Sequence, residues 1–304
     1  MDVPKQIRRL RRSEGLEKFI DALEQDGGVI IEDFADISII NQANAEVKPW
    51  IEEQKSSQGA KVGALGGKTR TVTRLVMRSP TVREVFYADP LHQTLCEHFL
   101  ALETTTWYGK EAQKNISHPL LSISIAFDIP PGTLAQGLHR DDKNHHARHV
   151  HASQYSRNRD MLLGLFVPGC STLRENGATR VIPGSHLWGD EKPDFGPGEA
   201  QGVIDAELKK GEAFIMLGSL YHGGGSYEKP VTDNPDSESR TVYAMFSCTG
   251  VHRQEEISFL SYPIEEVRTY SRVVQERLGW KQSEPNLGWV DLKSPEFLLR
   301  ELDQ

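Results

Sequence analysis

Two histidines and one aspartate have the spacing of a metal site. His139 and Asp141 stand two residues apart in the segment QGLHRD, and His222 precedes a run of three glycines. Residues i and i+2 of a strand point to the same face, so we expect His139 and Asp141 to bind one ion, with His222 as the third ligand. Two imidazoles and one carboxylate leave three coordination positions open, which is the facial triad of non-haem Fe(II) oxygenases.

An arginine downstream of this cluster indicates a second ligand. Arg240 lies 18 residues after His222 and begins the apolar run TVYAMF. A buried arginine is costly unless it pairs with a carboxylate, and a dicarboxylate co-substrate held by the guanidinium fork meets this need. An ordinary salt bridge is the alternative. A zinc hydrolase also uses two histidines and one aspartate, but it gives Gln136 and Arg240 no role.

Further histidines crowd the segment NHHARHVHASQYSRNRD. His145 and His149 have the HxxxH spacing of a second metal site if the segment is helical. We favour a solvated loop at the mouth of the site instead, because the segment is polar and basic and follows Asp141 directly. His186, in the segment PGSH, is interpreted as a structural turn residue rather than a ligand.

The elements that must position these residues change in type along the chain. Apolar periodicity predicts helices over 13–25, 37–53 and 89–102, with Pro49 as a kink or early end of the second, and a short strand over 29–31. Short β-rich runs separated by Gly and Pro follow, and helical sequence returns over 263–278. The β-rich runs cover 121–129, 161–167, 180–182, 202–206, 212–217 and 241–248. Helices followed by short strands predict one α+β domain around a β-sandwich or jelly roll.

Composition excludes several classes of function. The chain has 304 residues, 38% of them hydrophobic, and a formal net charge of −8. An acidic chain without a basic stripe or a long apolar run is a poor partner for nucleic acid or membrane. The three cysteines form neither a disulfide framework nor a CxxC metal pair, so we expect a reduced, intracellular and by default cytoplasmic location. The segment over 63–69 lacks the spacing of a phosphate-binding loop and is interpreted as a flap.

Four motifs carry a resemblance to a known family. They are LHRDD over 138–142, ENGATRVIPGSH over 175–186, YHGGG over 221–225 and LGW over 278–280. In this order and spacing the chain resembles the phytanoyl-CoA dioxygenase family of Fe(II)/2-oxoglutarate oxygenases, and within it the fungal branch that modifies natural products. The resemblance extends from the first predicted helix to about Asp291.

The resemblance implies a mainly β core, a double-stranded β-helix of the jelly-roll or cupin-like type, wrapped by N-terminal and C-terminal helices. A single oxygenase domain over 1–304 then divides into a helical part over about 1–118, the jelly roll over about 119–250 and a helical segment over about 251–304.

The resemblance also implies roles for particular residues. His139, Asp141 and His222 match the iron ligands, and Arg240 matches the arginine that binds the far carboxylate of 2-oxoglutarate. Gln136 and Thr179 match residues that face this co-substrate. The link between His222 and Arg240 is longer than in some relatives, through the segment 228–238. Arg74, and with it Arg70, falls where relatives place substrate-side residues, so these two arginines are predicted to determine specificity.

The implied chemistry needs Fe(II), 2-oxoglutarate and O₂, with ascorbate helpful in vitro. It releases succinate and CO₂ and oxidises a small, fairly apolar metabolite of the meroterpenoid or alkaloid type through hydrogen abstraction by a ferryl species. The outcome is hydroxylation, desaturation, rearrangement or endoperoxidation. An acyl-CoA hydroxylase of the same family and a catalytically silent cupin-like binding protein are the alternatives. The partner is a small molecule. The C-terminal segment, with Trp280 and Trp289, either packs on the core or forms a homodimer.

Overall fold

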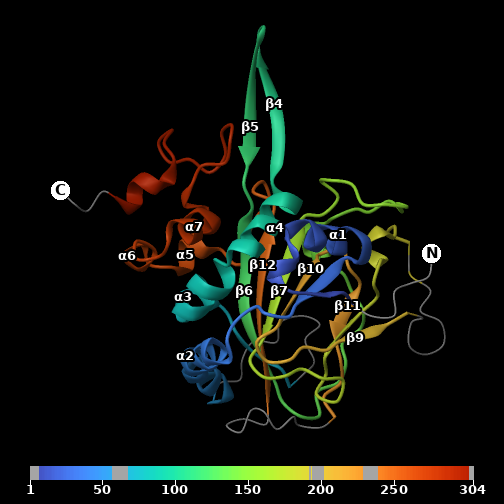
Figure 1. Ribbon diagram of the computed structural model, residues 1–304. Coiled ribbons are helices and arrows are strands. Elements are labelled where there is room, and N and C mark those ends of the chain that lie inside the picture. The colour runs from blue at the N-terminus through green and yellow to red at the C-terminus, as the bar shows by residue number, and fades with distance from the viewer. Residues whose placement is uncertain (1–6, 57–67, 192, 194–201, 229–238, 301–304) are drawn as a thin grey trace.

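A large mixed sheet forms the centre of the protein (Figure 1). The computed structural model describes residues 7–56, 68–191, 193, 202–228 and 239–300. The sheet has the strand order β1-β2-β10-β7-β12-β6-β3. These strands span Arg9–Leu10, Gly28–Ile31, Ala213–Leu217, Leu162–Pro168, Arg240–Cys248, Leu120–Ile129 and Arg70–Val72. All strand pairs in it are antiparallel except β1 with β2, which are parallel.

Alternating side chains give the sheet two apolar faces. On β12, Tyr243 and Met245 belong to one core cluster, whereas Val242, Ala244 and Phe246 belong to the other. This is the two-residue period of a strand buried on both faces. The first cluster contains residues of the longer helices, so these helices cover one face and leave the other face free to line a cavity.

The covering helices belong mostly to the N-terminal part. They are α1 (Leu16–Asp26), α2 (Ile37–Ser56), α3 (Leu75–Arg78), the π-helix Val82–Tyr87 and α4 (Pro90–Leu100). Asp89 caps α4 by accepting a hydrogen bond from the His92 N–H. Pro49 lies inside α2, which continues to Ser56, so of the two outcomes that we predicted there, a kink or an early end, the early end is wrong.

A three-stranded sheet carries two of the sequence motifs. Its order is β11 (His222–Gly224), β8 (Thr179–Val181) and β9 (Ile204–Ala206), and its strands pair antiparallel. Val181 and Ala206 of this sheet share a core cluster with Phe166 and Phe214 of the large sheet. A mainly β core of two sheets with helices around it confirms the predicted fold class.

Two features differ from the sequence expectation. β4 (Leu102–Tyr108) and β5 (Glu111–Ser117) form a hairpin that projects from the rest of the protein (Figure 1), inside the part that we expected to be helical. The helical stretch predicted over 263–278 is divided into α6 (Ile264–Val267), α7 (Arg272–Gln275) and the π-turn Glu276–Trp280, with α5 (Ser258–Ser261) before them. Among the described residues, the structure contains no helix with the length and apolar character of a membrane span.

Candidate metal and co-substrate site

His139 and His222 are held opposite each other by their backbones. The His139 N–H donates to the His222 carbonyl at 2.8 Å, and the His222 N–H donates to the His139 carbonyl at 3.0 Å. His222 begins β11, but His139 forms only this isolated bridge, and Asp141 begins a 3-10 turn over Asp141–His145. The strand that we expected at His139 and Asp141 is therefore absent. The bridge and the turn bring the side chains together instead.

The two imidazoles present the same nitrogen to Asp141. Nδ1 of His139 faces the Gly137 carbonyl at 2.8 Å, and Nδ1 of His222 faces the Leu220 carbonyl at 3.1 Å. Each Nδ1–H donates in this geometry, so Nε2 is the nitrogen that faces Asp141: it donates to the carboxylate when protonated and offers its lone pair to a metal when it is not. The Nε2 atoms lie 3.4 Å and 3.2 Å from the two oxygens of Asp141. These three groups offer ligand atoms that all lie within 4.8 Å of one another.

The electrostatics of the cluster suit a cation. Burial alone would raise the pKa of Asp141, but the charge of His222 and the hydrogen bonds from both histidines hold it well below its usual range. Burial alone would lower the pKa of His139, whereas the hydrogen bond and charge of Asp141 raise it. A carboxylate kept ionised between two imidazoles is a donor set that Fe(II) accepts, so the residues present fit an iron ion.

Arg240 is a buried cation in the same cavity. It is the first residue of β12, lies opposite Ile129 of β6 and is 3% exposed. Its Nε is buried without a hydrogen-bond partner in the described part of the chain, and burial lowers the pKa of Arg240 to about 10. A guanidinium with an unmet donor beside a metal site is suited to a carboxylate ligand, as the far end of 2-oxoglutarate would provide.

Gln136 and Thr179 line the cavity together with Arg240. Gln136 is tied to Gly224 of β11 twice: its N–H donates to the Gly224 carbonyl at 2.8 Å, and its Oε1 accepts from the Gly224 N–H at 2.8 Å. Thr179 begins β8 and pairs with the same glycine. The two predicted co-substrate residues and the predicted ligand His222 are therefore positioned by one strand.

Glycines allow the two motifs ENGAT and HGGG to pack backbone against backbone. Gly177 has φ +85°, and a Cβ there would lie 2.6 Å from the Gly225 carbonyl oxygen. A Cβ on Gly225 would lie 2.7 Å from the Ala178 carbonyl oxygen, to which the Gly225 N–H donates at 3.0 Å. Such separations exclude any side chain, which explains the glycines at both positions.

The cavity has a volume of about 340 Å³ and a largely apolar wall. Its lining includes the metal cluster, the three co-substrate residues and the apolar side chains Ile123, Ile125, Phe127, Ile129, Phe166, Val242 and Phe246. Asn144 also lines it, and this residue begins the segment that we expected at the mouth of the site. Arg140 and Glu255 line the cavity too, and sequence reasoning gave neither a role there. Glu255 lies in a loop after β12 and belongs to no motif, so no spacing could have indicated it.

Arg70 and Arg74 do not line this cavity. Arg70 forms an ion pair with Asp128 and donates to the Ser239 hydroxyl at 3.0 Å. Arg74 precedes α3 in the left-handed conformation, and its N–H donates to Glu256 at 2.9 Å. The cavity lining therefore gives no support to the predicted substrate contacts. Most of the segment 63–69 and of the link 228–238 lies outside the described residues.

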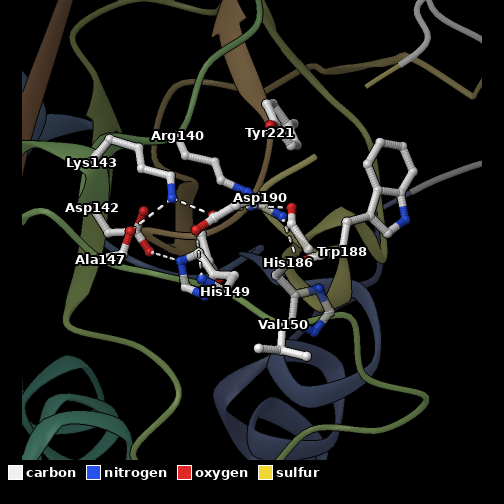
Figure 2. Close-up of polar contacts among 12 residues, drawn as sticks. Arg140, Asp142, Lys143, Ala147, His149, Val150, His186, Trp188, Asp190 and Tyr221 are labelled. Carbon is white, nitrogen blue, oxygen red and sulfur yellow. Dashed lines mark hydrogen bonds and ion pairs between the residues drawn. The ribbon is translucent and has the colours of Figure 1, made fainter. Parts of the chain in front are cut away.

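The histidine-rich segment is partly buried, which corrects the prediction of a solvated loop. His149 Nε2 lies 2.6 Å from Asp142 Oδ2, and the two side chains are 1% and 0% exposed. Figure 2 shows the Asp142 carboxylate directed at the His149 ring. His145 instead approaches Glu255, so it shares no ion with His149. Within the described ranges, His139, Asp141 and His222 are the one group with metal-binding geometry.

His186 packs away from the metal cluster, in agreement with a structural role. The side chain is fully buried, and its Nε2 donates to the Glu24 carbonyl at 2.9 Å. The three cysteines, Cys96, Cys170 and Cys248, are buried, and none of them forms a disulfide bond.

Known proteins are similar in sequence to this chain over most of its length. The family model described as phytanoyl-CoA dioxygenase matches residues 23–228. Dioxygenase himG of Aspergillus japonicus is 34% identical over 291 residues, which cover 92% of this chain and 86% of the relative. Dioxygenase peniF of Penicillium patulum is 33% identical over 290 residues, which cover 95% of this chain and 90% of the relative.

Solved structures share the fold. The non-haem α-ketoglutarate-dependent epimerase SnoN from nogalamycin biosynthesis has a TM-score of 0.56 at 19% identity, over 82% of this chain and 89% of that one. EctD from S. alaskensis with bound Fe has a TM-score of 0.53 at 16% identity, over 78% of this chain and 77% of that one. At these identities the likeness shows the fold alone.

Proposed function

Because this chain belongs to the phytanoyl-CoA dioxygenase family, we propose that it oxidises a C–H bond of a small, fairly apolar secondary metabolite. The membership makes the chain an oxygenase whose cofactors are Fe(II), 2-oxoglutarate and O₂. The observation that carries the proposal is the meeting, in one cavity, of the His139–Asp141–His222 cluster and the buried Arg240.

In this proposal His139, Asp141 and His222 hold the iron through two Nε2 atoms and one carboxylate. When bound, the metal supplies O₂ activation coupled to conversion of 2-oxoglutarate into succinate and CO₂. The residues themselves contribute geometry: the backbone bridge fixes the imidazoles, and the Gly137 and Leu220 carbonyls fix their tautomers. Ligands fixed before the metal arrives lose little freedom on binding it.

Arg240 binds the far carboxylate of 2-oxoglutarate in this proposal, and Thr179 and Gln136 face the same ligand. The buried Nε, which has no partner in the part of the chain that the structure describes, supports the role of Arg240, because a carboxylate would supply both charge and acceptor. The apolar side chains from β6 and β12 bind the metabolite and exclude water from it. The kind of oxidation depends on which carbon these walls place beside the metal.

Two alternatives are less well supported. An acyl-CoA substrate calls for a cluster of lysines and arginines at the mouth of the cavity. In the described part of the chain Glu255 stands at the mouth, and the guanidinium of Arg140, which also lines the cavity, is already bound to the Ser185, Trp188 and Gly189 carbonyls. A silent binding protein has no use for a complete set of predicted ligands beside an arginine whose Nε has no hydrogen-bond partner among the described residues. A hydrogen-abstraction step would give a kinetic isotope effect with a substrate deuterated at the oxidised carbon.

For partners, we propose a small molecule and neither nucleic acid nor membrane, because the net charge of −8 opposes binding to polyanions. Exposed apolar residues of the C-terminal segment, Leu287 and Trp289, are the surface that a homodimer would use. Sedimentation of the purified protein tests this last point.

The proposal is tested by succinate release from 2-oxoglutarate with Fe(II) and ascorbate under air. We expect slow turnover without a substrate, lost in His139→Ala and Arg240→Ala, and faster turnover with a member of a terpenoid and alkaloid panel. His151→Ala is the matched control, because His151 is an exposed histidine of the neighbouring loop. A wild-type protein that binds no Fe(II) and releases no succinate would contradict the proposal.

A further inference from the structure

One carboxylate in the cavity has no role in the proposed chemistry. Among the described residues that line the cavity, Asp141 and Glu255 carry the carboxylates, and Asp141 belongs to the metal cluster. The Glu255 side chain is 27% exposed, so it stands where the cavity opens. A negative charge at the opening of a largely apolar cavity indicates what the cavity selects.

The register of β6 and β12 places Glu255 and Arg240 at opposite ends of the cavity. Arg240 lies opposite Ile129, and Phe246 lies opposite Ile123, with all four residues lining the cavity. Six residues of extended strand separate the two pairs by about 20 Å. Glu255 lies at the Ile123 end, because its N–H donates to the hydroxyl of the adjacent Ser122.

The metal cluster stands between these two ends. Phe166 of β7 lies opposite Ala244, in the middle of β12, and its ring centroid is 6.4 Å from that of His222. The same ring is 5.4 Å from that of Phe246. A co-substrate that joins the metal to Arg240 therefore occupies one half of the cavity, and the half between the metal and Glu255 is left for the substrate.

Neighbouring side chains fix the Glu255 carboxylate without neutralising it. Oε1 accepts from the Ser122 hydroxyl at 3.2 Å, and Oε2 accepts from the Asn144 amide at 3.2 Å. Both donors are neutral, and each oxygen retains a lone pair. The nearest titratable group is His145, whose Nε2 lies 3.7 Å from Oε1, with the His252 ring packed against it at 5.5 Å.

Charge balance then decides what the substrate carries. In the loaded site, the positive charges of Fe(II) and Arg240 equal the negative charges of Asp141 and 2-oxoglutarate. Arg140 also lines the cavity, but its guanidinium donates to the Ser185, Trp188 and Gly189 carbonyls and lies 3.8 Å from Asp190, so its charge is met there. Glu255 remains as an uncompensated carboxylate that an apolar substrate would cover. Covering it with a neutral group removes water without replacing the lost interaction, whereas a cation restores it through a charge-assisted hydrogen bond.

We propose that the substrate is a lipophilic amine whose protonated nitrogen binds Glu255 at the Ile123 end of the cavity. This inference rests on the proposed function, because it uses the loaded metal and co-substrate to define the free half of the cavity. Ile123, Phe246 and Phe166 then contact the apolar body of the amine, and Glu255 determines which end of the molecule points away from the metal.

The test uses three probes with one indole-ethyl body: tryptamine, N-acetyltryptamine and indole-3-ethanol. Each is titrated calorimetrically into wild-type protein loaded with Fe(II) and 2-oxoglutarate, without O₂ and at pH 8, where histidine side chains do not normally carry a competing charge. Tryptamine is expected to bind at least about tenfold more tightly than the amide and the alcohol. This comparison needs no substitution.

Two variants assign the preference to Glu255. In Glu255→Gln, which keeps the shape and an acceptor for Ser122, tryptamine affinity is expected to fall to the level of the amide. Glu103→Gln removes an equal charge from an exposed position on the hairpin and should leave all three affinities unchanged. Equal binding of amine and alcohol, a preference that survives Glu255→Gln, or no binding of tryptamine would each overturn the inference.

A parallel assay separates this inference from the function beneath it. The same preparation is tested for Fe(II) retention, 2-oxoglutarate binding and slow succinate release. If these are present while tryptamine shows no preference, the oxygenase proposal stands and the amine inference is wrong. If iron and 2-oxoglutarate do not bind, both are wrong.

Discussion

His139 and His222 form an isolated antiparallel β-bridge, which brings their imidazole rings together without a metal ion. Their backbones exchange two hydrogen bonds, and their ring centroids lie 4.6 Å apart. One histidine comes from an irregular segment and the other from the first residue of β11. The bridge therefore holds two residues that are distant in sequence side by side, and the turn at Asp141 brings the third predicted ligand to them.

Arg240→Met should separate co-substrate binding from stability. Without its ligand the buried guanidinium is costly, so an unbranched apolar side chain of similar length should raise the free energy of unfolding of the ligand-free protein by about 1–4 kcal/mol. The same change should weaken 2-oxoglutarate binding by about 100-fold or more. Denaturant unfolding and calorimetric titration measure the two effects.

Arg240→Lys is the control, because it keeps the charge and loses the fork. It should retain part of the affinity for 2-oxoglutarate and none of the gain in stability. If Arg240→Met bound 2-oxoglutarate as tightly as the wild type, the co-substrate carboxylate would lie elsewhere in the cavity.

His149→Ala should destabilise the protein by about 3–5 kcal/mol, because it leaves the Asp142 carboxylate buried without its partner. Asp142 follows the ligand Asp141, and both backbone N–H groups donate to the Gly218 carbonyl. Loosening Asp142 should therefore also weaken Fe(II) binding. His92→Ala, at a fully buried histidine of α4, is the control: it should destabilise the fold and leave Fe(II) affinity unchanged. Unchanged affinity in His149→Ala would limit the pair to a structural role.

Residue types predicted the site better than they predicted its surroundings. His139, Asp141, His222, Gln136 and Arg240 line one cavity, as the motifs led us to expect, whereas the roles assigned to them stay predictions. The prediction of a strand at His139 and Asp141 was wrong. An isolated bridge and a turn bring the same side chains together without the two-residue period of a strand.

Other features had no local signal. The β4–β5 hairpin follows α4 directly, and its strands are largely exposed, so they lack the alternation of a half-buried strand. The polar sequence around His149 indicates an exposed loop. Its burial becomes favourable because its side chain pairs with that of Asp142, seven positions earlier. Glu255 enters the cavity through tertiary packing against Ser122, which no pattern along the chain records.

Gly177→Ala should destabilise the protein by about 1–3 kcal/mol or more, because the new Cβ would stand 2.6 Å from the Gly225 carbonyl oxygen at a positive φ. The movement needed to relieve this contact would displace β8 and β11, which carry Thr179 and His222. Gly15→Ala is the matched control: Gly15 has φ +91°, and nothing lies within 4 Å of a Cβ there. Thermal unfolding compares the two. Equal losses would mean that the backbone angle, and not the close approach, determines the cost.

His186 should make stability depend on pH between pH 7 and pH 5. Burial, together with the charges of Arg159 and Arg140, lowers the pKa of His186 to about 4, whereas an unfolded histidine titrates near 6.5. Between pH 7 and pH 5, His186 therefore binds a proton in the unfolded state and stays neutral in the folded state. The free energy of unfolding falls as pH drops through this window, by about 2 kcal/mol from this group.

The variant His186→Gln tests this prediction, because it keeps a donor for the Glu24 carbonyl and cannot titrate. It should lower stability at pH 7 and remove this part of the pH dependence, whereas His151→Gln, at an exposed histidine, should leave the pH dependence intact. Urea unfolding of the three proteins at pH 5, 6 and 7 measures the slopes, and an unchanged slope in His186→Gln would show that His186 is protonated in the folded protein.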